Sequence, residues 1–361
     1  MSSSIGTLFK LSTFGESHGL AIGGVIDGCP SGLKLDFKLI QDFLNKRRPG
    51  LGSLNSQRQE FDKVEFMSGI FNDITLGTPI GFIIKNIDSK SKDYDNLKNI
   101  FRPSHADFTY EKKYGIRDYR GGGRSSARET ANWVVAGAIA SQILKIKGIN
   151  IFSYVSSVGG VDIKKKINKF DSELIYNNDV RCPCPKTAQK IREIIAICKS
   201  KGDTVGGCIS TVVKGVPFGL GEPVFNKFQS GISKAIMGIN ACKGIAFGSG
   251  FSSSSKTGSE ENDAFIVKSG SVSTSSNNSG GVQGGISNGQ DICFHASFKP
   301  VSTIMKKQKT VDDKNNEITV SVFGRHDSCV VPRAVPIVES LTAITILDYY
   351  LLNKTTKISD I

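Results

Sequence analysis

The chain has 361 residues, 39% hydrophobic and 22% charged, which is the composition of a globular protein with a sizeable core. We find no run of about 20 apolar residues that indicates a membrane span, no apolar leader, and no CxxC pair among the eight cysteines. We therefore expect a cytoplasmic protein with free thiols and no metal site. The 46 basic side chains outnumber the 33 acidic ones, and the net charge of +13 indicates small anions or nucleic acid as partners.

Apolar runs and alternation predict strands, and apolar residues at helical spacing predict helices. In chain order the expected strands are 20–27, 80–87, 151–158, 208–213, 291–298 and 318–323, and the expected helices are 37–46, 126–147, 187–199 and 335–352. Serine- and asparagine-rich stretches are expected to be loops at 252–259 and 271–279. Because both element types occur throughout, we predict one large α+β domain over 1–352 and a polar tail, 353–361, that frays.

The first segment with chemical potential is TFGESHG, at 13–19. His18 stands between small residues, and the glycines on both sides allow a ligand to approach the backbone closely. Histidine is the natural proton donor near neutral pH, since its unperturbed pKa is ~6.5. The pattern favours an acid–base residue, and a turn with an incidental histidine is the alternative.

The second segment is FRPSHAD, at 101–107. It holds Arg102, His105 and Asp107 close together, and Pro103 stiffens the backbone between them. A structural salt bridge is one interpretation. The chain has only four histidines, however, and two of them lie in polar segments beside glycine or proline, which favours a functional site.

The third segment is DYRGGGRSSARET, at 118–130. Ser126 and Glu129 form an S-x-x-E pattern, which predicts a capping box at the start of a helix. Helix N-termini attract anions, and Arg120, Arg124 and Arg128 crowd this one. Three neighbouring arginines repel one another unless a polyanion lies among them, so we predict an anion site. Neither a Walker loop nor a dinucleotide fingerprint is present.

Two glycine-containing segments follow in the last third of the chain. SGGVQGGISNGQ, at 279–290, fits either a ligand approaching the backbone or a set of turns. GRHD, at 324–327, offers Arg325 to hold an anion and Asp327 to accept a proton, with a loop ion pair as the alternative. His295 lies on an alternating strand and is expected to be structural, whereas His326 is open between ligand contact and scaffold.

These five segments occur in the order and approximate spacing of the chorismate synthase family, together with RRPG at 47–50, GVPFGLGEPVF at 215–225 and INACKG at 239–244. The chain resembles that family to about Leu352. The resemblance implies an enzyme that eliminates phosphate from 5-enolpyruvylshikimate 3-phosphate to form chorismate, on the route to the aromatic amino acids. It also implies reduced FMN (FMNH2) with no net redox change, a β-α-β sandwich fold and a homotetramer.

The resemblance implies roles for individual residues as well. His18 would protonate the departing phosphate, His105 would manage flavin protonation, and Asp327 would help flavin N5 to act as a base. The anionic groups of the substrate would be held by Arg47, Arg102, Arg128 and Arg325. Flavin contacts would come from Arg124, Ser125, Ser126, Asn240, Ala241, Gly284, Lys299, Pro300, Val301, Ser302, Thr303 and Arg325, so the division of Arg325 between the two ligands is left open.

One departure from the family concerns nucleotide binding. Where the family usually has an arginine soon after RRPG, this chain has Ser53. The missing cation weakens the case for NADPH binding. We therefore expect the flavin to arrive already reduced, from a separate flavin reductase.

Two other functions share parts of the pattern. A different flavin- or phosphate-dependent enzyme on the same scaffold, such as an oxidoreductase, would change the redox state of its flavin in each turnover. A nucleic-acid-binding protein would need basic stripes with aromatic stacking partners, and the sequence has none. The partners expected are therefore a small-molecule substrate and copies of the same chain, with no nucleic acid and no membrane.

Overall fold

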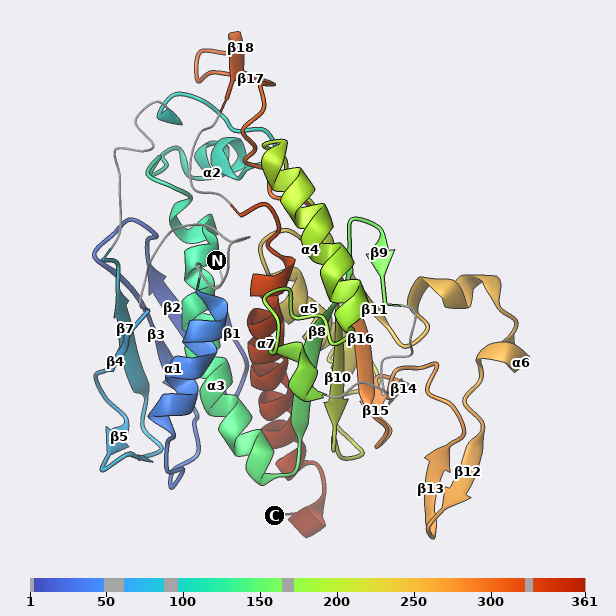
Figure 1. The fold of residues 1–361 in the computed structure, drawn as a ribbon. Coiled ribbons are helices and arrows are strands. Elements are labelled where there is room, and N and C mark those ends of the chain that lie inside the picture. The colour runs from blue at the N-terminus through green and yellow to red at the C-terminus, as the bar shows by residue number, and fades with distance from the viewer. Residues whose placement is uncertain (1–2, 49–61, 88–96, 164–171, 322–326, 361) are drawn as a thin grey trace.

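The computed structural model describes residues 3–48, 62–87, 97–163, 172–321 and 327–360. Two five-stranded antiparallel sheets enclose a layer of helices, with the N-terminal sheet on one side of the helices and the second sheet on the other (Figure 1). This is the β-α-β sandwich of the expected α+β class. Each sheet turns one apolar face to the helices, which is why three layers form around one core.

The N-terminal sheet has the order β1-β2-β3-β7-β4. Its strands are β1 (Ser4–Ile5), β2 (Lys10–Gly15), β3 (Ala21–Asp27), β7 (Ile80–Lys85) and β4 (Val64–Phe66). Leu11 pairs with Ile26, and Ile26 pairs with Ile80, so that one register position carries buried side chains across three strands. The small hairpin β5 (Ile70–Phe71) and β6 (Ile74–Thr75) lies beside this sheet.

The second sheet has the order β11-β16-β10-β8-β9. Its strands are β11 (Cys242–Phe247), β16 (Ile292–Phe298), β10 (Gly207–Lys214), β8 (Asn150–Val158) and β9 (Val161–Asp162). In β16 the sequence alternates buried and half-buried positions as expected for a strand with one face on the core. His295 on this strand is half-buried and shares a 2.7 Å hydrogen bond with Ser210 Oγ, as expected for a structural histidine.

The helices between the sheets are α1 (Phe37–Arg47), α3 (Thr130–Ile146) and α7 (Val331–Leu352), and α5 (Phe228–Met237) packs on α7 and β11. Helices α3 and α7 approach closely at Gly137, where an added Cβ would lie 2.2 Å from the Cβ of Ser340. At the far end of α7, the carboxylate of Asp348 accepts the backbone N–H groups of Thr7, Leu8 and Phe9 at 2.7–3.0 Å. These bonds tie the start of the chain to its last long helix.

Helix α7 is also the one described helix that is long and apolar enough to cross a membrane by length and composition. It does not contradict the expectation that no run of about 20 apolar residues is present, because Arg333, Glu339 and Asp348 interrupt the helix. Helix α7 meets the criterion of length and composition because it is apolar around most of its circumference. It is a core helix, since 83% of its most apolar window is buried inside the protein.

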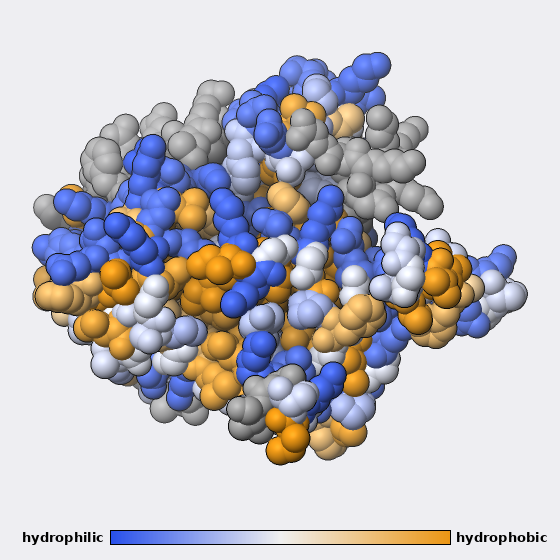
Figure 2. Space-filling view, turned by 90° about the horizontal axis from the view of Figure 1, so that it is seen from below, coloured by the Kyte–Doolittle hydropathy of each residue, from blue (hydrophilic) through white to orange (hydrophobic). Residues whose placement is uncertain are grey.

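An arm projects from the second sheet. It contains α6 (Gly258–Glu261) and the hairpin β12 (Phe265–Lys268) and β13 (Ser271–Thr274). Phe265, Val267 and Val272 are exposed on this hairpin, and Figure 2 shows apolar side chains gathered on the projecting arm. Residues 271–274, expected to be a loop, form β13 because they pair in register with β12, with Val272 opposite Val267.

The remaining elements are α2 (Asp107–Tyr114), α4 (Pro185–Ser200), the hairpin β14 (Val282–Gln283) and β15 (Ile286–Ser287), and the hairpin β17 (Gln308–Val311) and β18 (Glu317–Val320). The expected strand 318–323 is thus β18, and its last residues lie outside the described ranges. The tail beyond Leu352 forms two short 3-10 turns, Asn353–Thr355 and Ile358–Asp360. Most of its described side chains are exposed.

Candidate active site

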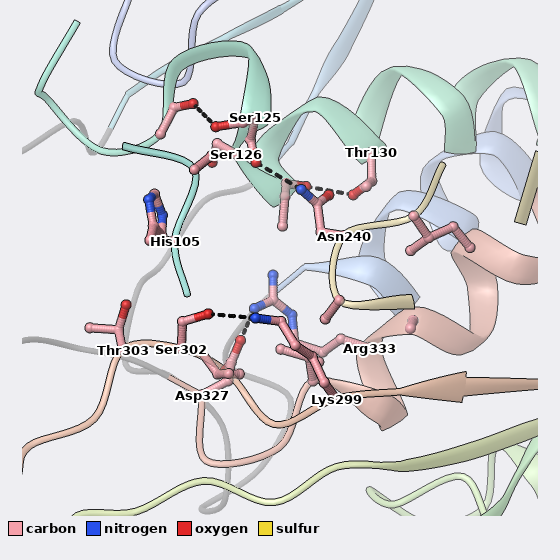
Figure 3. Close-up of a pocket in the computed structure, with 18 of the residues that line it drawn as sticks. His105, Ser125, Ser126, Thr130, Asn240, Lys299, Ser302, Thr303, Asp327 and Arg333 are labelled. Carbon is pink, nitrogen blue, oxygen red and sulfur yellow. Dashed lines mark hydrogen bonds and ion pairs between the residues drawn. The ribbon is translucent and has the colours of Figure 1, made fainter. Parts of the chain in front are cut away.

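A cavity of ≈ 420 Å³ opens where the N-terminal ends of α3 and α7 meet four loops. The loops come from distant parts of the sequence: 102–106, 121–127, 239–241 and 299–303 (Figure 3). Most of the residues singled out from the sequence line it, namely His18, Arg47, Arg102, His105, Ser125, Ser126, Asn240, Ala241, Lys299, Pro300, Val301, Ser302, Thr303 and Asp327. The cavity is of ordinary size for a small-molecule site.

His18 enters the cavity from the loop after β2. Its Nδ1 lies 3.1 Å from the hydroxyl of the buried Ser17. A Cβ at Gly121 would lie 2.5 Å from the His18 ring, so the glycine backbone packs directly against the imidazole. Gly121 also has a φ of +82°, a conformation that other residues rarely adopt. The triple glycine therefore makes room for this histidine.

His105 shares a carboxylate with a neighbouring arginine. Its Nδ1 lies 2.8 Å from Asp107 Oδ1, and Asp107 also accepts both Nε and Nη2 of Arg102 at 2.7 Å. Burial acts to raise the pKa of Asp107, but the hydrogen bonds from Arg102 and His105 outweigh it and hold the pKa well below its usual range. Arg102 Nη2 also donates to the Gly121 carbonyl at 2.8 Å, which links this group to the loop under the other histidine.

Arg47 and Arg128 share the buried carboxylate of Asp62. Arg47 donates to Asp62 Oδ2 at 2.7 Å, and Arg128 donates to the other carboxylate oxygen. Arg47 also donates to Thr130 Oγ1 and to the Ala127 carbonyl, each at 2.9 Å. Burial acts to raise the pKa of Asp62, but the two guanidinium groups lower it below its ordinary value. Arg47 lines the cavity in a fixed orientation, whereas Arg128 lies behind the wall.

Each of the three arginines around the triple glycine already forms an ion pair with a carboxylate of the protein, so no ligand is needed to offset their mutual repulsion. Arg124 donates to the Glu129 carboxylate and to Thr13 Oγ1, and it does not line the cavity. Carboxylates of the protein supply the negative charge that we expected from a bound polyanion, in the pairs Arg120–Asp118, Arg124–Glu129 and Arg128–Asp62.

The predicted capping box is also wrong, because its glutamate forms an ion pair with an arginine. Ser126 does cap, but its hydroxyl accepts the N–H of Arg128 at 3.3 Å, at the start of a 3-10 turn, Ala127–Glu129, that precedes α3. The Glu129 carboxylate, which a capping box needs at the helix start, binds Arg124 instead.

The opposite wall carries a lysine and hydroxyl groups. Lys299 Nζ donates to the Ser104 carbonyl at 3.1 Å and to Ser302 Oγ at 3.0 Å, and Ser302 Oγ donates to the same carbonyl at 2.8 Å. Partial burial lowers the pKa of Lys299. Asn240 joins the two walls, because its side-chain amide donates to the Ser125 carbonyl at 2.7 Å.

Asp327 closes the cavity beside the start of α7, where it forms an ion pair with Arg333. Arg333 Nε also donates to the Arg47 carbonyl at 3.3 Å, which connects α7 to the end of α1. Arg325, Ser53 and His326 lie outside the described residues. Gly284 lies in the turn between β14 and β15 and does not line this cavity.

Sequence reasoning assigned no role to several residues of the site. Asp62 and Ser17 are buried partners of an arginine and a histidine, and Thr130 and Arg333 line the cavity. Asp62 stands in no motif and reaches Arg47 only through the fold. Arg333 could have been recognised from the sequence, because it follows the GRHD segment and most arginines of this chain lie near glycine or proline.

Two histidines, fixed cations and hydroxyl donors around one accessible cavity define an enzyme that acts on an anionic small molecule. Comparisons with known proteins give the class more closely. A family model described as chorismate synthase matches residues 9–351. The chain therefore belongs to the chorismate synthase family, the carbon–oxygen lyases that form chorismate in aromatic amino-acid biosynthesis.

Individual relatives agree with this assignment over nearly the whole chain. A chorismate synthase of Christiangramia forsetii is 57% identical over 98% of this chain and 99% of its own length. One of Phocaeicola vulgatus is 54% identical over 99% and 100%. A crystal structure of chorismate synthase superposes with a TM-score of 0.77 at 29% identity, covering 96% of this chain and 92% of the other.

Proposed function

We propose that this chain eliminates phosphate from 5-enolpyruvylshikimate 3-phosphate to give chorismate, with reduced FMN and no net redox change. The observation that carries the proposal is the pair His18 and His105 on one cavity whose walls also hold Arg47, Arg102 and Lys299. The reaction breaks a C–O bond to phosphate and removes a ring proton as a C=C bond forms. It therefore needs a proton donor, a proton acceptor and fixed cations, and the cavity offers all three.

Two neighbouring cavities support a site for two ligands, a flavin and a substrate. A second cavity of ≈ 390 Å³ adjoins the first and shares with it Ala106, Gly121, Gly122 and Ser125. Apolar side chains of Ile239, Val301 and Ile337 line the first cavity and can pack against a planar ring, while Lys299 can face a phosphate. When bound, the reduced flavin would supply an electron-rich ring whose N5 accepts the proton that the substrate loses.

In this proposal His18 is the general acid. As the acid, His18 is an imidazolium whose Nδ1–H donates to the Ser17 hydroxyl and whose Nε2–H can pass its proton to the departing phosphate, which leaves a neutral ring. His105 manages the protonation of the flavin, and Asp327 assists proton removal from the side of α7. Arg325 also belongs to this assignment through the family resemblance alone.

The arginines divide into two groups. Arg47 and Arg102 line the cavity and would contact the substrate's anionic groups directly. Arg128 and Arg124 would act from behind, by fixing Asp62 and Glu129. For the flavin we propose contacts with the lining residues Ser125, Ser126, Asn240, Ala241, Lys299, Pro300, Val301, Ser302 and Thr303. A contact with Gly284 would require the β14–β15 turn of this or another copy of the chain to reach the site.

We further propose a cytoplasmic homotetramer whose flavin is reduced by a separate reductase. Exposed apolar side chains on the arm support assembly, since monomers rarely expose contiguous apolar patches (Figure 2). We also propose that residues 1–352 form one domain, because a single apolar cluster joins both sheets and the central helices.

The experiment is anaerobic turnover of 5-enolpyruvylshikimate 3-phosphate with dithionite-reduced FMN, following chorismate, phosphate and the flavin spectrum. Equal release of chorismate and phosphate, with the flavin still reduced, supports the proposal. Binding of both ligands without product would contradict it. Net oxidation of the flavin in each turnover would instead identify an oxidoreductase.

A further inference from the structure

One carboxylate of the site has no assigned role. Asp107 is the only buried residue of the short surface helix α2. A buried carboxylate is costly unless it is paired and hydrogen-bonded. It accepts none of the N–H groups of its own helix among the described residues, so helix capping does not explain it. Its hydrogen-bond donors are Arg102 and His105.

The backbone is bent to bring both donors to this carboxylate. Ser104 has a φ of +56°, which is strained for a residue other than glycine, and the N–H of His105 donates to the Arg102 carbonyl at 3.1 Å. The resulting turn directs the Arg102 and His105 side chains at the same group. Strain that the surrounding structure maintains is common at functional sites.

The chemistry of the pair fixes the proton of His105. Asp107 is ionised, because its pKa is held below the ordinary range, so it can only accept hydrogen bonds. His105 Nδ1 must then carry a hydrogen. In the neutral ring Nε2 is left with its lone pair, on the far side of the imidazole from Asp107. His105 lines the cavity, and its side chain is 23% exposed while that of Asp107 is 4% exposed.

We propose that Asp107 is the positioning residue of this site: it holds His105 as the Nδ1–H tautomer, with Nε2 available to exchange protons in the cavity, and it holds the Arg102 guanidinium in place at the same time. The proposal deepens the function proposed above and rests on it. It makes the two histidines different in kind. His18 contacts a hydroxyl, which can either donate or accept, whereas His105 contacts a carboxylate, which can only accept.

The charged groups that contact Asp107 besides His105 are Arg102 and Arg117, with Glu111 beyond Arg117, and Lys299 binds the carbonyl of the neighbouring Ser104. Arg117 Nη1 lies 3.3 Å from Asp107 Oδ1 and its Nε lies 2.8 Å from Glu111 Oε2. Glu111→Gln therefore removes a nearby negative charge without touching His105, and it is the matched control for Asp107→Asn.

The first measurement is the ¹⁵N NMR spectrum of histidine-labelled protein, which has only four histidines. We expect the neutral His105 ring of the unaltered protein to be protonated at Nδ1, and in Asp107→Asn we expect a shift toward the Nε2–H form. A His105 ring protonated at Nε2 in the unaltered protein would overturn the proposal, whether or not any variant folds. This readout does not depend on turnover, so it separates the proposal from the proposed function.

The second measurement is kcat against pH for Asp107→Asn, His105→Ala and the double variant. We expect Asp107→Asn to lower kcat about 10²-fold across the pH range, because the His105 ring loses the acceptor that fixes its tautomer. The double variant should lose no more than His105→Ala alone. Glu111→Gln should keep kcat within about twofold. Independent, multiplying losses in the double variant would show a merely structural role for Asp107.

Discussion

The two walls of the cavity differ in how their polar groups are engaged. On the arginine wall, the guanidinium groups of Arg47 and Arg102 are buried and already bind carboxylates of the protein. On the lysine wall, Lys299 is half-buried and Asn240 is exposed, and both bind backbone carbonyls or a hydroxyl. One wall is therefore set before a ligand arrives, whereas the other offers groups that a ligand can complete. Preorganised cations of the first kind stabilise charge in a transition state without rearranging.

The largest expected effect comes from the proton-transfer residues between the walls. His18→Ala and His105→Ala should each lower kcat by about 10²- to 10⁴-fold, because general acid–base catalysis contributes this much. Flavin and substrate binding should remain measurable. His295→Ala is the control for histidine chemistry, since His295 binds Ser210 in the second sheet. Full turnover by either cavity variant would remove that histidine from the mechanism.

The arginine wall is tested by Asp62→Asn, which leaves two buried arginines without their carboxylate. We expect a loss of about 3–5 kcal/mol in the free energy of unfolding, measured by chemical denaturation. The folded pKa of Asp62 is depressed, so its stabilisation is present above the unfolded pKa of ~3.9 and is lost as pH falls through the folded value. The difference between the two proteins should therefore shrink below about pH 4.

The control for this variant is Glu65→Gln. Glu65 pairs with Lys85 at 2.9 Å, but the side chains are 38% and 60% exposed. An exposed pair contributes about 0–1 kcal/mol, so the control should stay near the unaltered protein. Equal losses for Asp62→Asn and Glu65→Gln would show that the arginine wall is not specially organised.

The helical layer behind both walls is tested by Gly137→Ala. The added methyl group would meet Ser340 of α7, and we expect a loss of about 1–3 kcal/mol in the free energy of unfolding. Gly244→Ala is the control, because nothing lies within 4 Å of its added Cβ. If Gly137→Ala also lowers kcat, then the spacing of α3 and α7 sets the distance between the walls.

The smallest expected effect concerns the lysine wall. Burial, and to a lesser degree Lys243, lowers the pKa of Lys299. Because only the protonated amine attracts a phosphate, FMN affinity should fall, by about 1 kcal/mol or roughly fivefold, as pH rises through this lowered pKa. Lys299→Arg should remove the decline, and Lys243→Gln should move it to higher pH. Equilibrium titration of FMN across this pH range would measure it, and an unchanged profile in Lys299→Arg would separate Lys299 from the phosphate.

The sequence predicts the core elements well because their patterns are long and regular. Helix α7 and strand β16 match their expected ranges closely, although α7 begins at Val331 rather than 335. The elements that the sequence did not predict are short or have no regular apolar pattern. In β2, KLSTFG buries one side chain only, and α5 contains an internal glycine. Their assignment depends on neighbours that the chain supplies elsewhere, such as β3 and α7.

The sequence predicted which segments form the site, but it did not predict the ion pairs that connect them. Segments 13–19, 101–107, 118–130 and 299–303 do meet at one cavity. The expectation that a polyanion must separate the arginines was wrong, because Asp62 lies far from Arg128 in the sequence but contacts it in the fold. Local spacing reports what a segment can do alone, and buried ion pairs between distant segments are fixed only by the tertiary structure.

Helix α7 has a consequence for the biosynthesis of the protein. It packs against α1, α3, α5, β8 and β10, and it begins beside Asp327 and Arg333 at the cavity. It also follows both sheets and the other central helices in the sequence, so it leaves the ribosome after them. Until it emerges, both sheets and the other central helices lack the surface on which they close. A nascent chain can therefore form its catalytic cavity only after α7 has been synthesised, however early the two sheets emerge.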